Sequence, residues 1–125
     1  TVAVLVIDPA DPRHVAVCNV GDSRVYQICA GMPHLLTCDH RIDSTHTLTR
    51  AVGVAQRVET HWQEFVFERT SRFLVCTDGV HDTISDQRIA VFASAGPPHL
   101  AAARLSEDIL KHGAADNYSF VLVSV

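Results

Sequence analysis

Phe73-Leu74-Val75-Cys76-Thr77-Asp78-Gly79 is a compact apolar segment that runs directly into a carboxylate and a glycine. Four consecutive apolar residues bounded by a turn signal are typical of a buried β-strand. We therefore expect a strand that ends at Asp78. The residues on either side of this segment predict what packs around it.

Two helices are predicted after this strand. Ser85 is a suitable N-cap for a helix that continues through Ala93, with Ile89 and Phe92 facing inward. Gly96-Pro97-Pro98 ends that helix, and proline suits the first turn of the next one. The second helix has an apolar stripe of Ala102, Leu105 and Ile109, and Gly113 is a natural stop.

Further strands are predicted on both sides of this central region. They cover residues 2–7, 14–20, 24–30, 34–37, 58–67 and 118–125. Short turn clusters separate the early strands, so we expect an antiparallel meander over the first forty residues, with Gly21-Asp22-Ser23 as a hairpin turn. Many strands with one helical pair predict an α+β fold of layered, mainly antiparallel sheets flanked by helices. Residues 1–125 form a single domain in this prediction.

Composition excludes several function classes. The 125 residues are 47% hydrophobic and carry a formal net charge of −4, which is typical of a globular domain and argues against a nucleic-acid partner. The longest apolar run, residues 2–7, is far shorter than the ~20 residues that span a bilayer. No signal segment opens the chain, so a cytoplasmic location is expected. The four cysteines form no C-x-x-C pair, and we expect buried reduced thiols rather than a disulfide or a zinc site.

Three aspartates stand out by their position. Asp78 follows a buried strand, Asp116 precedes Asn117 and the last strand, and Asp39 follows a short strand. Carboxylates at strand ends can converge at one edge of a sheet, where a hard divalent cation finds oxygen ligands on a fixed backbone. Taken singly, each aspartate is more simply a turn residue, because Asp-Gly and Asp-Asn are common turn dipeptides.

The combination of motifs is more specific than any single residue. In chain order the motifs are Asn19-Val20-Gly21-Asp22-Ser23-Arg24, Leu36-Thr37-Cys38-Asp39-His40, Leu48-Thr49-Arg50-Ala51-Val52-Gly53, Cys76-Thr77-Asp78-Gly79 and Ala115-Asp116-Asn117. This ordered set resembles the later motifs of the PP2C (PPM) metal-dependent protein serine/threonine phosphatases. The resemblance covers essentially the whole chain and implies that family's α-β-β-α sandwich.

The resemblance also implies a mechanism and its ligands. Asp78 and Asp116 match ligands of the family's dinuclear Mn²⁺ or Mg²⁺ centre, and Asp39 matches a residue that helps to hold a third, weaker metal in bacterial-type members. Such a centre activates a bridging water for attack on a phosphoserine or phosphothreonine, without a covalent phosphoenzyme. The implied partner is a phosphoprotein substrate.

Other residues of the motifs are expected to support the site. Gly79 and Asn117 belong to the loops that carry Asp78 and Asp116, and Arg24 and Arg50 are expected to tie loops together. His40 either donates a proton to the leaving oxygen or orients Asp39, although a structural role is favoured. The remaining histidines show no ligand spacing and are predicted to be surface or turn residues: His14, His34, His46, His61, His81, His99 and His112.

The sequence departs from the family pattern in two places. No D-G-x-G-G segment exists to supply the aspartate that bridges both metals in the family, and only residues 41–47 stand where members usually carry a longer flap. We therefore expect residues 1–125 to be the later part of the catalytic domain, without its N-terminal portion and incomplete or inactive alone. The alternative is a catalytically inactive PP2C-like module that binds or regulates a phosphoprotein.

Overall fold

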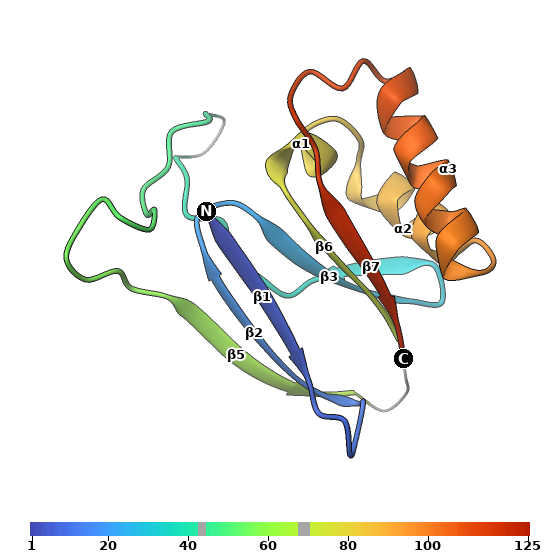
Figure 1. Ribbon diagram of the computed structural model, residues 1–125, viewed down its shortest axis with the longest axis horizontal. Coiled ribbons are helices and arrows are strands. Elements are labelled where there is room, and N and C mark those ends of the chain that lie inside the picture. The colour runs from blue at the N-terminus through green and yellow to red at the C-terminus, as the bar shows by residue number, and fades with distance from the viewer. Residues whose placement is uncertain (43–44, 68–70) are drawn as a thin grey trace.

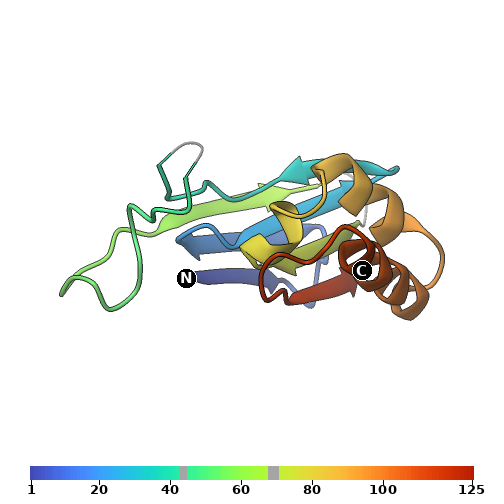
Figure 2. The same cartoon turned by 90° about the horizontal axis from the view of Figure 1, so that it is seen from above.

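The computed structural model describes residues 1–42, 45–67 and 71–125 and has three layers. A three-stranded sheet packs against a four-stranded sheet, and helices cover the other face of the four-stranded sheet (Figure 1, Figure 2). All strand pairs in the described ranges are antiparallel. The predicted α+β class with layered antiparallel sheets is thereby confirmed.

The three-stranded sheet has the order β1-β2-β5. Its strands are β1 (Val2–Ile7), β2 (His14–Val20) and β5 (His61–Val66). Cys18 of β2 lies opposite Val4 on one side and Trp62 on the other. Because side chains alternate along a strand, one set of β1 residues faces the second sheet and the other set faces outward. The inward set is Ala3, Leu5 and Ile7, and the outward set is Val2, Val4 and Val6.

The four-stranded sheet has the order β4-β3-β6-β7. Its strands are β3 (Arg24–Cys29), β4 (Met32–Leu35), β6 (Arg72–Cys76) and β7 (Phe120–Ser124). The strand predicted at 34–37 was placed too late in the sequence. Ala30 and Gly31 both have positive φ, 51° and 74°, so the turn is complete before Met32. Pro33 is tolerated within β4 because β4 is an edge strand.

The predicted meander is wrong at Gly21-Asp22-Ser23. This segment is not a hairpin turn, because β2 pairs with β1 and β5 whereas β3 pairs with β4 and β6. The chain crosses there from one sheet to the other with Gly21 at φ +99°. Buried Asn19 anchors the crossing: its Nδ2 donates to the carbonyl oxygens of Gly21 (3.2 Å) and Cys38 (2.7 Å).

Three helices follow β6. A single turn, α1 (Asp78–His81), was not predicted, whereas α2 (Asp86–Ser94) and α3 (Pro98–Lys111) were. The Ser85 N-cap is confirmed, since its Oγ accepts a hydrogen bond from Arg88 N at 3.4 Å. The buried stripe of α3 runs through Ala101, Leu105, Asp108 and Ile109, so Ala102 was assigned to the wrong position of the helical face.

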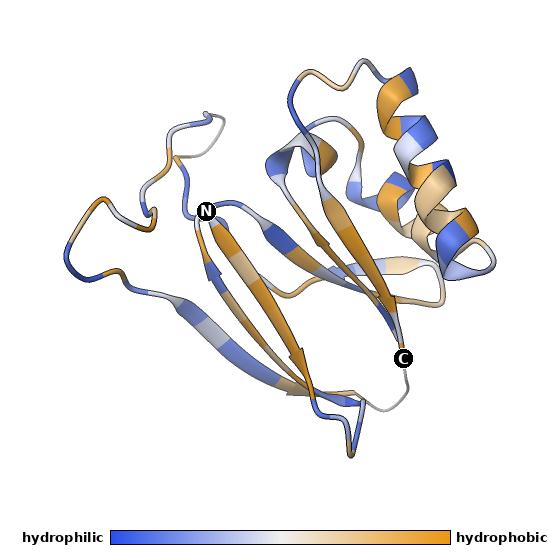
Figure 3. Cartoon of the chain, in the orientation of Figure 1, coloured by the Kyte–Doolittle hydropathy of each residue, from blue (hydrophilic) through white to orange (hydrophobic). Residues whose placement is uncertain are grey.

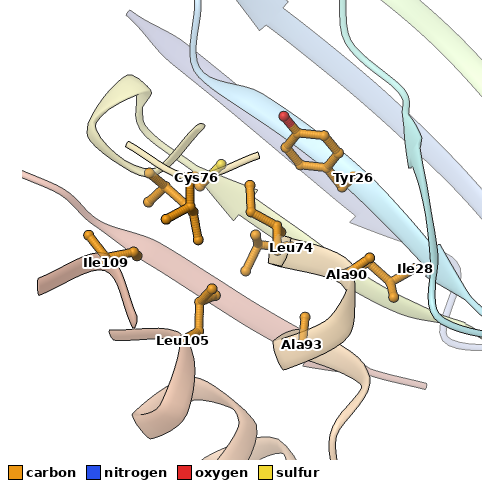
Figure 4. Packing of buried hydrophobic residues seen from close by; sticks show 11 residues of the cluster. Tyr26, Ile28, Leu74, Cys76, Ala90, Ala93, Leu105 and Ile109 are labelled. Atoms are coloured by element: carbon orange, nitrogen blue, oxygen red, sulfur yellow. The ribbon is translucent and has the colours of Figure 1, made fainter. Parts of the chain in front are cut away.

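The four-stranded sheet separates two hydrophobic cores. The first core lies between this sheet and the helices, where Tyr26 and Leu74 meet Ala90, Leu105 and Ile109 (Figure 4). The second lies between the two sheets and is built on Val15, Val17, Val25, Leu36 and Phe73. Each of the two central strands β3 and β6 therefore has apolar residues on both faces, which explains the continuous apolar run at residues 73–76.

The four cysteines are free thiols with different exposure. Cys76 is buried, and this burial raises the pKa of its thiol to about 12. Cys38 is exposed and Cys18 and Cys29 are half-buried, so the expectation that all four are buried holds fully at Cys76 alone. None of the helices in the described ranges has the length and apolar character that a membrane-spanning helix needs.

Candidate metal centre

A cleft of about 320 Å³ lies where α1 meets the loop before β7. Its lining consists of His46, Asp78, Gly79, Asp82, Thr83, Ala115 and Asp116. Asp78 and Asp116 are 38 positions apart (116 − 78) and yet share this cleft. The structure therefore brings together two of the three aspartates that the sequence singled out.

Backbone contacts hold the two acidic segments side by side. Thr77 N donates to the carbonyl oxygen of Ser119 at 3.0 Å, and Ser119 N donates back to Thr77 Oγ1 at 3.0 Å. One oxygen of each carboxylate is used locally. Asp78 Oδ1 accepts from Gly79 N at 2.9 Å, and Asp116 Oδ1 accepts from Asn117 N at 2.7 Å. These bonds fix the carboxylates near their own backbone and leave each Oδ2 without a hydrogen-bond partner among the described residues.

Gly79 sets how closely the two segments approach. A Cβ at this position would lie 2.3 Å from the carbonyl oxygen of Asn117 and 3.2 Å from Tyr118 Cα. Both are backbone atoms, so no side-chain rotation would relieve the overlap. Close packing therefore requires a glycine at position 79, apart from the tendency of Asp-Gly to form turns.

Two cleft residues were missed by the sequence analysis. Ligand atoms of His46, Asp78 and Asp82 all lie within 4.8 Å of one another. Asp82 reaches Asp78 because the two are four residues apart around α1, and prediction of that helical turn would have paired them. Arg41 holds Asp82 with a two-point contact of 2.9 and 3.0 Å. Burial raises the pKa of Asp82, but the Arg41 hydrogen bonds and the nearby charges of His81, Arg41 and His46 together lower it below its ordinary value.

Asp39 lies outside the cleft lining and is held by arginines. Its carboxylate accepts from Arg24 Nε at 2.9 Å and from Arg24 Nη2 at 2.7 Å, and Arg41 Nε lies 3.4 Å away. Burial raises the pKa of Asp39, but the Arg24 contacts together with the nearby charges of His81 and Arg41 make the net shift downward. The expectation that Arg24 ties loops together is confirmed, because this pair joins β3 to the loop after β4.

The hydrogen bonds of Arg24 extend through Tyr26 to α2. Arg24 Nη1 donates to Tyr26 Oη at 2.8 Å, and Tyr26 Oη donates to Asp86 Oδ1 at 2.8 Å. Desolvation raises the pKa of the fully buried Tyr26, so its hydroxyl stays protonated and able to donate. Through these bonds the β3 strand, the Asp39 loop and α2 are one hydrogen-bonded unit.

Asp22 and His81 join the sheet crossing to α1. Asp22 is 4% exposed, and its carbonyl oxygen accepts from His81 Nε2 at 2.9 Å. The prediction that His81 is a surface or turn residue is wrong, because its side chain is fully buried. His81 Nδ1 lies 3.2 Å from Asp82 Oδ1 but without hydrogen-bond geometry. The crossing at Gly21–Ser23 is thus anchored directly behind the Asp78 turn.

His40 and Arg50 form a second support, away from the cleft lining. His40 is buried, and its Nδ1 accepts from Gly21 N at 3.2 Å. Arg50 Nη1 lies 3.4 Å from His40 Nε2, and Arg50 Nη2 pairs with Glu59 at 3.0 Å. These contacts place His40 as a structural link between the sheet crossing and the loop that contains Arg50.

We expect acid to weaken the fold through His40. Burial, together with the nearby positive charge of Arg50 and His61, lowers the pKa of His40 below its ordinary 6.5. The unfolded chain therefore binds this proton at a higher pH than the folded chain, so stability falls as the pH drops below about 6.5. A protonated ring also cannot accept the Gly21 N–H bond.

The measurement is the free energy of unfolding in urea between pH 7.5 and 5.5 for the natural chain and for His40→Asn. Because His40 binds one proton, it can change the free energy of unfolding by at most about 1.4 kcal/mol per pH unit. The asparagine oxygen can accept from Gly21 N but does not titrate, so the variant should show a shallower slope. An identical slope in both proteins would assign the acid sensitivity to other groups.

The donor set of the cleft fits a hard divalent cation. Asp78 and Asp116 supply carboxylate oxygens, and neither pairs with an arginine or a lysine within the described ranges. Mg²⁺ and Mn²⁺ favour such ligands and keep several waters, for which a cleft of about 320 Å³ has room. Gly79 permits the close approach of the two segments, and the Thr77–Ser119 hydrogen bonds supply the fixed geometry that a metal site needs.

Comparisons with known proteins agree with this arrangement at the level of the fold. No family model matches the sequence, and neither does any curated protein sequence. Among solved structures, PppA of Pseudomonas aeruginosa, described as a key regulatory component of its T6SS, matches with a TM-score of 0.85 at 25% identity. The match covers 98% of this chain and 56% of PppA.

Two further solved structures are serine/threonine phosphatases. Stp1 of Staphylococcus aureus matches with a TM-score of 0.87 at 22% identity, over 98% of this chain and 55% of Stp1. The PPM phosphatase MsPP of Mycobacterium smegmatis matches with a TM-score of 0.86 at 24% identity, over 98% of this chain and 61% of MsPP. This chain thus spans little more than half the length of the proteins it matches. It has the fold of the PPM (PP2C-type) serine/threonine phosphatases, as a part of their domain.

Proposed function

We propose that this chain takes part in metal-dependent hydrolysis of phosphoserine and phosphothreonine in proteins, as part of a PPM phosphatase domain. The observation that carries the proposal is the single cleft shared by Asp78 and Asp116, whose separation is set by Gly79. Two carboxylates from distant segments are held together there without a neutralising arginine among the described residues. The two uncompensated negative charges favour a bound cation, and binding of the cation in turn stabilises the folded chain.

Each residue of the cleft has a defined task in this proposal. Asp78 and Asp116 would hold Mn²⁺ or Mg²⁺ through the carboxylate oxygens that their own backbone leaves free. The bound cations would supply the Lewis acidity that lowers the pKa of a water and neutralises phosphoryl charge. The paired Thr77 and Ser119 backbones keep the two carboxylates at a constant separation.

Arg41 and Arg24 set the charge around the cleft. Arg41 neutralises Asp82 and lies 3.9 Å from Asp22, while Arg24 neutralises Asp39. The negative charge available to a cation is thereby concentrated on Asp78 and Asp116. In this proposal Asp39 would reach a third cation only after releasing one of its contacts with Arg24, which makes that site the weakest of the set.

The test is phosphate release from a phosphothreonine peptide with Mn²⁺ and with a chelator. Asp78→Ala and Asp116→Ala should each lower the Mn²⁺-dependent rate by about 100-fold or more, because loss of either carboxylate removes a ligand. Asp11→Ala is the matched control, since Asp11 is an exposed aspartate that forms an ion pair with Arg13, outside the cleft lining. Its rate should stay unchanged.

A second readout separates metal binding from turnover. Mn²⁺ should raise the melting temperature of the natural chain and of Asp11→Ala but not that of Asp78→Ala. Turnover that survives in Asp78→Ala would disprove the assigned ligands. A folded chain that shows the Mn²⁺ shift without turnover would contradict catalysis by residues 1–125 alone.

One observation favours a second candidate function, a non-catalytic module that binds a phosphoprotein. Asp39 and Asp82 are both already neutralised by arginines, so the described residues offer few free carboxylates for more than one cation. Binding of the phosphothreonine peptide to a folded chain without any turnover, retained in Asp78→Ala, would favour this module over the enzyme.

A further inference from the structure

Three carboxylates from different parts of the chain converge on the side chain of Arg41. Asp82 accepts from Arg41 Nη1 at 2.9 Å and from Nη2 at 3.0 Å. Asp39 lies 3.4 Å from Arg41 Nε, and Asp22 lies 3.9 Å from Nη1. The start of β3 and part of α1, next to which Asp22 and Asp82 lie, are coloured as hydrophilic (Figure 3). One cationic side chain therefore faces three anions.

Water reaches this group of charges only in part. The exposed fractions of the side chains are 6% for Asp22, 18% for Asp39, 19% for Arg41 and 27% for Asp82. Charges interact more strongly where water is excluded, so three carboxylates at this place repel one another unless a cation lies among them. The fold therefore needs positive charge at this point, and Arg41 supplies it from within the chain.

Asp22 depends on Arg41 more than Asp39 does. Asp39 also accepts from Arg24, at 2.9 and 2.7 Å. Within residues 1–42, 45–67 and 71–125, Arg41 is the one basic side chain that forms an ion pair with Asp22. Loss of Arg41 would therefore leave Asp22 as a buried carboxylate without a cationic partner among these residues, which strongly favours the uptake of another cation.

The backbone holds Arg41 at this position. On one side of Arg41, the carbonyl oxygen of His40 accepts from Thr49 N at 2.8 Å. On the other side, Ile42 N donates to the carbonyl oxygen of Thr47 at 2.9 Å. Because both neighbours of Arg41 are fixed in this way, the guanidinium is placed among the carboxylates by the fold as well as by its own ion pairs.

A third cation, which the resemblance to PPM phosphatases implies at Asp39, does not fit these contacts. Asp39 Oδ1 accepts from Arg24 Nε at 2.9 Å, and Oδ2 accepts from Arg24 Nη2 at 2.7 Å. Oδ2 also faces Arg41. A metal ion at Asp39 would have to displace two guanidinium groups that already neutralise the carboxylate and that repel an incoming cation.

We propose that Arg41 takes the place of a metal ion among Asp22, Asp39 and Asp82. Mg²⁺ and Mn²⁺ keep several waters, so carboxylates spaced around a guanidinium are also suitably spaced for a hydrated ion. Removal of Arg41 therefore converts the three carboxylates into a cation site that the natural chain does not offer. The ions that the natural chain binds at the cleft rest on the proposed function, whereas this role of Arg41 does not.

The first test counts the Mn²⁺ ions that bind to the folded chain in equilibrium dialysis. Arg41→Met should bind one ion more than the natural chain, and Arg41→Met/Asp22→Asn should lose this extra ion. Arg41→Lys is the matched control, because it keeps a positive charge at the same position and should bind as many ions as the natural chain. Equal numbers of ions in Arg41→Met and in the natural chain would overturn the proposal.

Thermal unfolding keeps the test valid should Arg41→Met unfold without metal. Mn²⁺ should raise the melting temperature of Arg41→Met more than that of the natural chain or of Arg41→Lys, and should refold the variant if it is unfolded in a chelator. An equal or smaller rise, or no refolding, would overturn the proposal. An ion gained by Arg41→Met when the natural chain binds none would support this role of Arg41 and contradict the metal centre at Asp78 and Asp116.

Discussion

Replacing Gly79 by alanine should destabilise the fold by about 1–3 kcal/mol and should remove Mn²⁺ binding at the cleft. The added Cβ would lie 2.3 Å from the carbonyl oxygen of Asn117. Because that oxygen belongs to the backbone, the loop that carries Asp116 has to move away from α1. The two carboxylates would then no longer share one cleft of fixed width.

Helix propensity alone predicts the opposite sign for this substitution. Alanine is favoured over glycine within a helix by about 1 kcal/mol, and Gly79 belongs to the α1 turn. The overlap with Asn117 decides the outcome, since a Cβ contact under 3.0 Å against backbone atoms cannot relax cheaply. A loss of stability in Gly79→Ala would show that the overlap with Asn117 controls this position, and a gain would show that helix propensity controls it.

The measurement combines urea unfolding with titration of Mn²⁺ into the folded protein. Gly96→Ala serves as a control, because Gly96 has φ +79° and open space around its Cβ position. That variant should lose stability through backbone strain alone and bind Mn²⁺ like the natural chain. Unchanged Mn²⁺ binding in Gly79→Ala would show that the close approach of the two loops is not needed for the site.

The second large effect is expected at Arg24. Arg24→Met should lower the free energy of unfolding by about 3 kcal/mol, at the low end of the range for a broken buried ion pair. The side chains of Arg24 and Asp39 are 15% and 18% exposed, so some solvent reaches the carboxylate that remains. Tyr26 Oη also loses the hydrogen bond that it accepts from Arg24.

Arg13→Met provides a comparison with similar contact distances and greater exposure. Arg13 Nε lies 2.8 Å from Asp11, but the two side chains are 49% and 39% exposed, so the loss of Arg13 should cost much less stability than the loss of Arg24. The double variant Arg24→Met/Asp39→Leu should recover part of the loss, because no unpaired charge remains. Equal costs for Arg24→Met and Arg13→Met would mean that the Arg24 network does not stabilise the core.

The sequence predicted those strands and helices that depend on residues close together in the chain. The apolar run at residues 73–76 predicted β6, and Ser85 predicted the start of α2. The position of β4 was missed by two residues because Ala30, a non-glycine residue at positive φ, takes part in the turn. Such a conformation is rare for alanine and leaves no sequence signal.

Features that depend on distant contacts were predicted less well. Gly21-Asp22-Ser23 has the composition of a hairpin turn, and only the pairing of β2 with β5 and of β3 with β6 reveals a crossing between sheets. Motif order identified Asp78 and Asp116, which share the cleft, whereas His46 and Asp82 carried no motif. The contact of Arg41 with Asp82 joins residues 41 positions apart, which no local pattern encodes.

The crossing at Gly21 also fixes the order in which the molecule can be assembled during synthesis. Among the described residues of 1–60, the paired strands are the β1–β2 and β3–β4 hairpins, because β5 and β6 come later. Two-stranded hairpins are at best marginally stable in water. Within these residues, neither core can therefore close until later elements are made, because each core needs strands or helices that follow residue 60.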